Sequence, residues 1–130
     1  MSVLIGYVPT PVGDAALHMA LTEARRRDTS ILLVNASTGD ATADPRHLNS
    51  EQLETVTAQL AASGVPHTIE VRSGRDPVDE IVALSEDPAV EVVVIGLRHR
   101  NPVGKLLWGS TAQRILLEVE CPVLAVKASR

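Results

Sequence analysis

Aromatic residues are almost absent from this sequence of 130 residues, which has no phenylalanine, one tyrosine (Tyr7) and one tryptophan (Trp108). The core must therefore be built from Val, Leu, Ile and Ala, which are nearly all of the hydrophobic residues. Proteins that bind single-stranded nucleic acid stack bases on aromatic side chains, so this class of partner is disfavoured. The net charge of −4 also gives no general attraction to a phosphate backbone. We expect no nucleic-acid partner, and any phosphate site should be local.

Cysteine and long apolar runs are scarce as well. Cys121 is the only cysteine, which excludes an intrachain disulfide or a cysteine metal cluster and is typical of a reducing compartment. No stretch approaches the ~20 apolar residues of a membrane helix, and the first residues lack the charged start of a signal peptide. We expect a soluble cytoplasmic protein that makes no membrane contact.

Short aliphatic runs recur along the whole chain and predict five strands. The runs at 3–8, 31–34 and 90–95 are nearly continuous in apolar residues, which is typical of strands buried on both faces of a parallel sheet. A fourth run lies at 123–126. Residues 68–72 alternate apolar with polar side chains, so this strand should lie nearer an edge of the sheet.

Helix-length segments lie between these runs. They cover about 13–27 and 49–63, and two more open at Asp76-Pro77 and Gly109-Ser110, which are helix-start signals. Strands that alternate with helices predict one domain over the whole chain, an α/β fold with a doubly wound parallel sheet. The polar segment 36–48 is the one stretch long enough for a true loop, and we expect it at the surface.

In a sheet of this kind, ligands bind beyond the carboxyl ends of the strands where the strand order reverses. The loop after 90–95 is the richer candidate, because it contains the cations Arg98, Arg100 and Lys105 and leads into Gly109-Ser110-Thr111. A helix N-terminus with two hydroxyls and nearby cations predicts an anion site, best suited to phosphate. A simple helix cap is the alternative for Gly109 and Ser110, but a cap does not need the cations.

The same loop carries a family resemblance. Gly96, His99, Gly109 and Ser110 stand at the spacing of a motif with Gly, two residues, Gly, nine residues, Gly, then Ser or Thr, with histidine in place of the second glycine. This motif marks nucleotide-binding universal stress proteins, which the chain also resembles at its start and at 121–127. The sequence is therefore similar to the single-domain bacterial type of this family over essentially its whole length. Together with the alternating pattern, this implies the strand order 3-2-1-4-5 of an adenine-nucleotide alpha-hydrolase-like fold.

The resemblance implies a regulatory protein that binds ATP or a related adenine nucleotide, with Mg²⁺, between the first and fourth strands. Gly96, Arg98 and Arg100 would surround the sugar and inner phosphates, and Gly109, Ser110 and Thr111 would hold the outer phosphates. The base would be framed by Val8, Pro9, Thr10 and Val34. The resemblance also implies a homodimer formed through Val123, Leu124 and Val126 of the last strand. This apolar run contains no charge that would prevent the edge strand from pairing with another chain.

Two departures from the family pattern leave a second function open. Val8 stands where ATP-binding members have an aspartate that contacts the ribose, and valine accepts no hydrogen bond. His99 is an ordinary loop histidine, a contact to the ligand, or a side chain that blocks the site. The alternative is thus a nucleotide-free dimeric interaction protein with a degenerate site. The dimer itself has an alternative, in which the last strand is covered by the helix at 110–119 and a loop of its own chain.

Catalysis finds little support in the sequence. A receiver domain needs an acidic pair after its first strand, where this chain has Gly6-Tyr7-Val8. A dinucleotide fold needs Gly-x-Gly-x-x-Gly there, and only Gly6 and Gly13 are near. No nucleophile elbow of a hydrolase is present. We expect at most slow hydrolysis of ATP.

Overall fold

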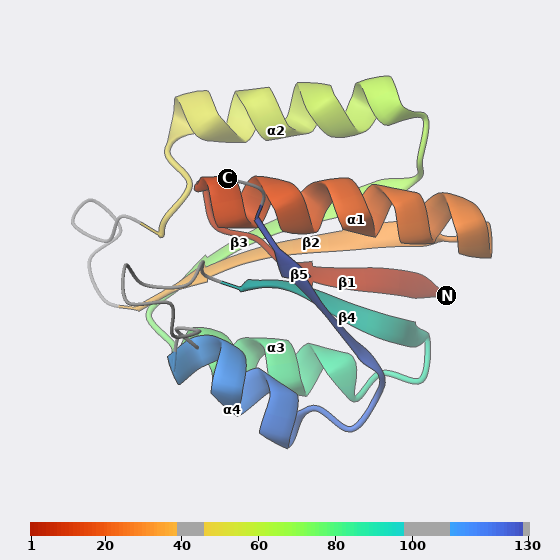
Figure 1. Cartoon of the computed structure of the whole chain (residues 1–130). Helices are drawn as coiled ribbons and strands as arrows, with labels where there is room; N and C mark the ends of the chain where they lie inside the picture. Colours follow the sequence, from red (N-terminus) through yellow and green to blue (C-terminus); the bar gives the residue numbers. More distant parts are fainter. Residues whose placement is uncertain (39–45, 98–109, 129–130) are drawn as a thin grey trace.

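The computed structural model describes residues 1–38, 46–97 and 110–128, and in them strands alternate strictly with helices (Figure 1). The predicted α/β class is confirmed. The elements in chain order are β1 (Ser2–Gly6), α1 (Pro11–Arg27), β2 (Ser30–Ser37), α2 (Ser50–Ser63), β3 (His67–Ser73), α3 (Pro77–Ser85), β4 (Val90–Leu97), α4 (Ser110–Glu118) and β5 (Val123–Lys127). No helix among the described residues is long and apolar enough to cross a membrane.

The sheet is parallel and has the order β3-β2-β1-β4-β5, as predicted. β1 lies at its centre, with Leu4 opposite Leu32 of β2 on one side and opposite Val93 of β4 on the other. The chain leaves β1 towards β2 and later returns to β4 on the opposite side. The reversal of strand order therefore falls between β1 and β4, which is where a ligand site was predicted.

Two helices cover each face of the sheet (Figure 1). Because side chains alternate along a strand, Val3 and Ile5 of β1 pack in the cluster below α1 and α2, and Leu4 packs in the cluster of α3 and α4. All three are fully buried. The core is aliphatic, as the composition predicts, and Tyr7 is the aromatic residue among its described members.

Helix-start residues place the beginnings of α1 and α3 at the edge of the sheet where the strands end (Figure 1). Thr10 caps α1 and Pro11 is its first residue, so this helix starts two residues before the predicted position. Asp76 caps α3 in the same way, with Pro77 after it. Both residue pairs are local signals, but our prediction rests on Asp76-Pro77 alone, and it places the start of the first helix from its apolar pattern.

Two predicted boundaries are wrong. β1 ends at Gly6, so Tyr7 and Val8 belong to the connection that follows the strand. β2 continues to Ser37, whose side chain is fully buried. The first residues of the predicted surface loop 36–48 therefore belong to the sheet. Its last residue, Leu48, is a member of the core. Residues 39–45 lie outside the described residues.

Candidate functional site

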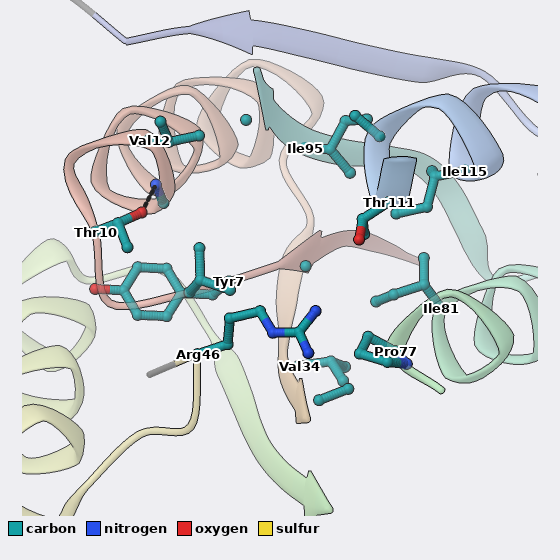
Figure 2. Close-up of a pocket in the computed structure, with 16 residues that line it drawn as sticks. Tyr7, Thr10, Val12, Val34, Arg46, Pro77, Ile81, Ile95, Thr111 and Ile115 are labelled. Carbon is teal, nitrogen blue, oxygen red and sulfur yellow. Dashed lines mark hydrogen bonds between the residues drawn. The ribbon is translucent and has the colours of Figure 1, made fainter. Parts of the chain in front are cut away.

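A cavity of about 460 Å³ opens at the carboxyl ends of β1 and β4 (Figure 2). Its size is within the range of small-molecule sites in proteins. The wall comes from the β1–α1 connection, the ends of β2 and β4, the start of α3 and the start of α4. It is lined by Gly6, Tyr7, Val8, Thr10, Val12, Gly13, Val34, Ala36, Arg46, Pro77, Ile81, Ile95, Gly96, Thr111, Ala112 and Ile115.

Five of the residues predicted from the sequence meet in this cavity, although they come from four separate segments of the chain. They are Val8, Thr10, Val34, Gly96 and Thr111. Pro9 lies in the same connection as Val8 and Thr10 but does not line the wall. Ser110 is the first residue of α4. Arg98, His99, Arg100 and Gly109 lie outside the described residues.

The connection after β1 is held against α1 by close backbone packing. The Thr10 hydroxyl accepts a hydrogen bond from the Gly13 N–H at 3.2 Å, which caps the helix. A β-carbon placed on Gly13 would lie 1.8 Å from the carbonyl oxygen of Val8. A side chain at this position would displace the backbone of Val8, so a glycine allows the wall that contains Val8 and Thr10 to lie directly against α1.

Gly96 lines the cavity, and packing also requires a glycine at this position. In the structure, a β-carbon on Gly96 would lie 2.4 Å from Cγ1 of Val12 and 2.5 Å from the carbonyl oxygen of Val12. The first turn of α1 therefore requires a glycine at this point of β4, whether or not a ligand binds.

Tyr7 was not predicted as a site residue, yet it lines the cavity and is 5% exposed. Its hydroxyl donates a hydrogen bond to Oδ1 of Asp14 at 2.8 Å. Burial raises the pKa of the Tyr7 phenol well above its ordinary value, and the Asp14 carboxylate raises it further. The group is therefore a neutral donor at physiological pH, and it ties the connection after β1 to the first turn of α1.

A buried amide joins β2 to the segment before α2. Asn35 is fully buried, and its Nδ2 donates to the carbonyl oxygens of Tyr7 at 2.9 Å and Arg46 at 2.6 Å. Its Oδ1 accepts from the N–H of Leu48 at 3.0 Å. All three contacts are to backbone groups of other segments, and together they satisfy the buried amide. The signal in the sequence was an amide at the end of an aliphatic strand, which periodicity alone does not interpret.

Arg46 is the functional candidate that sequence reasoning missed, because it stands in the segment interpreted as a surface loop. It is the one charged side chain among the described lining residues, and no carboxylate is among them. Figure 2 shows its guanidinium pointing into the cavity between Tyr7, Val34 and Pro77. The described wall thus combines aliphatic side chains, a few hydroxyls and a cation.

The sequence also matches a known family. The sequence model of the universal stress protein family matches residues 1–127. The chain belongs to this family. A universal stress protein of Mycolicibacterium smegmatis is 49% identical over 125 residues, which are 96% of each chain.

Solved universal stress proteins share the fold. One from Archaeoglobus fulgidus superposes with a TM-score of 0.78 at 26% identity and covers 97% of each chain. A second from that organism, in complex with dAMP, has a TM-score of 0.63 at 18% identity and covers 97% of this chain and 96% of its own. A universal stress protein in complex with cAMP has a TM-score of 0.67 at 19% identity, and the match covers 99% of this chain and 98% of the other chain.

In this universal stress protein, ion pairs connect the start of α3 to the middle of α4. Arg114 of α4 donates to Asp76 at 3.0 Å, to Asp79 at 3.2 Å and to Glu118 at 3.0 Å. Burial alone would raise the pKa of Asp76, but hydrogen bonds from the N–H of Val78 and from Arg114 outweigh it, so the pKa lies below its ordinary value. The ion pairs to Asp76 and Asp79 help to hold α4, which contains Thr111, beside α3.

The last strand of the universal stress protein domain lies at the edge of the sheet, as the resemblance implied. Its apolar side chains are less exposed than the sequence suggested, because both faces pack on helices of the same chain. Leu124 and Val126 are partly buried against the cluster that contains α1, and Val123 against the cluster that contains α4. The edge of the strand away from β4 has no strand partner among the described residues.

Proposed function

We propose that this protein binds ATP or a related adenine nucleotide in the cavity between β1 and β4, as a regulatory protein. The observation that carries the proposal is the convergence of Val8, Thr10, Val34, Gly96 and Thr111 on one cavity at the reversal of strand order. Sites of small ligands in open α/β sheets lie at this place. Relatives that share the fold were solved in complex with dAMP and cAMP, which supports an adenine nucleotide as the ligand.

The start of α4 is the part of the wall that suits the phosphates. α4 begins at Ser110, and Thr111 and Ala112 line the cavity. The N-terminus of a helix carries unpaired N–H groups and a partial positive charge, both of which favour an anion. The Thr111 hydroxyl, visible in Figure 2, adds a donor to the same side of the cavity. The predicted contacts of Arg98, Arg100, Gly109 and Ser110 would add to this end.

The described residues offer no site at which the protein itself would hold Mg²⁺. No group of three or more His, Cys, Asp or Glu in the described part of the chain is arranged to hold a metal ion. No carboxylate is among the described lining residues either, and Mg²⁺ prefers carboxylate and phosphate oxygens. An accompanying Mg²⁺ would be bound by the phosphates of ATP, and we assign no residue to it.

Calorimetric titration with ATP, at fixed Mg²⁺, tests the proposal. We expect saturable binding at one site per chain. Ser110→Ala and Thr111→Val should each weaken it about tenfold, because a hydrogen bond to a charged group is lost. Thr55→Val is the matched control, since Thr55 is an exposed threonine in α2, away from the cavity. Unchanged affinity in both Ser110→Ala and Thr111→Val would remove the phosphate assignment.

The second candidate is the nucleotide-free dimeric interaction protein. The observation that favours it is Val8, which places an apolar side chain in the wall where ATP-binding members carry an aspartate. The same titration separates the two functions. Absence of binding at millimolar ATP, with a dimer in solution, would support the second candidate and overturn the first.

A further inference from the structure

The inference concerns the end of the cavity opposite α4, and it rests on the proposed function. Thr111 of α4 lies on one side of the cavity, and Arg46 and Val34 lie on the other (Figure 2). If the phosphates occupy the positive end of α4, the nucleotide extends across the cavity. Its base then reaches the side formed by β2 and the segment before α2.

This side of the cavity has apolar walls but few flat surfaces. Val34, Pro77 and Ile81 are aliphatic, and the one aromatic ring among the described lining residues belongs to Tyr7, whose hydroxyl is bonded to Asp14. A purine base is planar and gains most from a planar partner. The guanidinium of Arg46 is the other planar group here, and it points between Tyr7, Val34 and Pro77 (Figure 2).

The backbone of Arg46 is fixed in the wall. Its carbonyl oxygen accepts the 2.6 Å hydrogen bond from the fully buried Asn35, so the side chain starts from an anchored point. Its Nη2 donates to Oγ1 of Thr38 at 3.5 Å. This bond uses an edge of the guanidinium. Stacking uses its faces, so the contacts that Arg46 makes through its edges do not compete with a base.

We propose that Arg46 is a base-binding residue, whose guanidinium plane stacks on the purine of the bound nucleotide. Arginine stacks on aromatic faces and is weakly hydrated, whereas the lysine ammonium is a compact, strongly hydrated charge. Arg46 thereby supplies a planar surface in a wall where Tyr7 is the one aromatic residue among the described lining residues. Arg46 then contributes to the binding of the base, and the start of α4 binds the phosphates. The stacking makes the site selective for purine over pyrimidine nucleotides.

The test compares ligands with and without a base on three variants. Titrations use ATP, UTP and inorganic tripolyphosphate with wild type, Arg46→Ala and Arg46→Lys. Arg26→Ala is the control, because the Arg26 side chain is 72% exposed at the far end of α1. We expect Arg46→Ala to bind ATP about tenfold more weakly and tripolyphosphate within twofold of wild type. Arg46→Lys should resemble Arg46→Ala, and the preference for ATP over UTP should fall in both.

Each other outcome overturns the proposal. An equal loss of affinity for ATP and tripolyphosphate in Arg46→Ala would show that the residue contacts the phosphates. Wild-type affinity in Arg46→Lys would show that only the positive charge matters. Unchanged ATP affinity would remove the contact. Ratios between ligands measured on one variant are independent of its folded fraction, so partial unfolding cannot imitate the result. If wild type binds none of the three ligands, the proposed function fails. If wild type binds ATP but the Arg46 variants bind it equally well, only the present inference is refuted.

Discussion

Gly13 in the first turn of α1 lies directly against the carbonyl oxygen of Val8, so closely that a β-carbon on Gly13 would come within 1.8 Å of it. The contact is between backbone atoms, so no rotation of a side chain relieves it. It fixes the connection after β1 over the start of α1, and with it one wall of the cavity.

Gly13→Ala should therefore destabilise the protein, although alanine is the better helix residue. In an open helix position the change would gain about 1 kcal/mol. Overpacking costs about 1–3 kcal/mol, so we expect a net loss in the free energy of unfolding measured with urea. Gly6→Ala is the matched control, because its β-carbon would lie 3.4 Å from Cδ1 of Ile81, an ordinary contact. Equal stability of both variants would show that the connection moves freely.

Val8→Asp should strengthen nucleotide binding if the missing carboxylate is what weakens the site. A carboxylate at Val8, which lines the cavity, would accept hydrogen bonds from the ribose hydroxyls. Such a hydrogen bond to a charged group, partly offset by repulsion between the carboxylate and the phosphates, should raise the affinity for ATP about tenfold. Val8→Asn, of similar size and without charge, is the control. We also expect Val8→Asp with His99→Gly to bind at least as tightly as Val8→Asp, and no gain in either variant would contradict the assignment.

Acid should remove the stabilisation that comes from Asp76. Its folded-state pKa is below the ordinary value because the N–H of Val78 and Arg114 donate to its carboxylate. A lowered pKa adds stability that is present above the unfolded pKa and is lost as the pH falls through the folded pKa. Asp76→Asn keeps the helix cap but not the charge. The melting temperatures of wild type and Asp76→Asn should differ at pH 7 and converge as the pH falls through the lowered pKa of Asp76, and a constant difference would contradict the ion pair.

Dimerisation through β5 remains a prediction, and the structure sharpens its test. Leu124→Asp or Val126→Asp should shift the protein to monomer in sedimentation velocity at micromolar concentration. Since both side chains are partly buried against α1 and its neighbours, a charge there also costs fold stability. Leu53→Asp in α2, packed on the same cluster, should lower the melting temperature and leave the dimer intact. A wild type that is monomeric at this concentration would defeat the prediction.

Much of the fold could be predicted because its signals are local. Aliphatic runs marked the strands, and Thr10-Pro11 and Asp76-Pro77 begin α1 and α3. The switch point followed from the alternation of elements and the family resemblance, and it brought Val8 and Thr111 to one cavity. These residues stand beside the ends of strands and helices, where position in the chain already implies position in the sheet.

The tertiary structure alone decided the roles that depend on contacts between distant segments. Gly96 must be glycine because Val12, 84 positions earlier, occupies the space of its side chain. Arg46 lines the cavity because the buried amide of Asn35 holds the segment before α2 against the end of β2. Periodicity reports which face of one element is apolar. It contains no information on which atoms of another element fill the space beside that face, and that packing sets the shape and charge of this cavity.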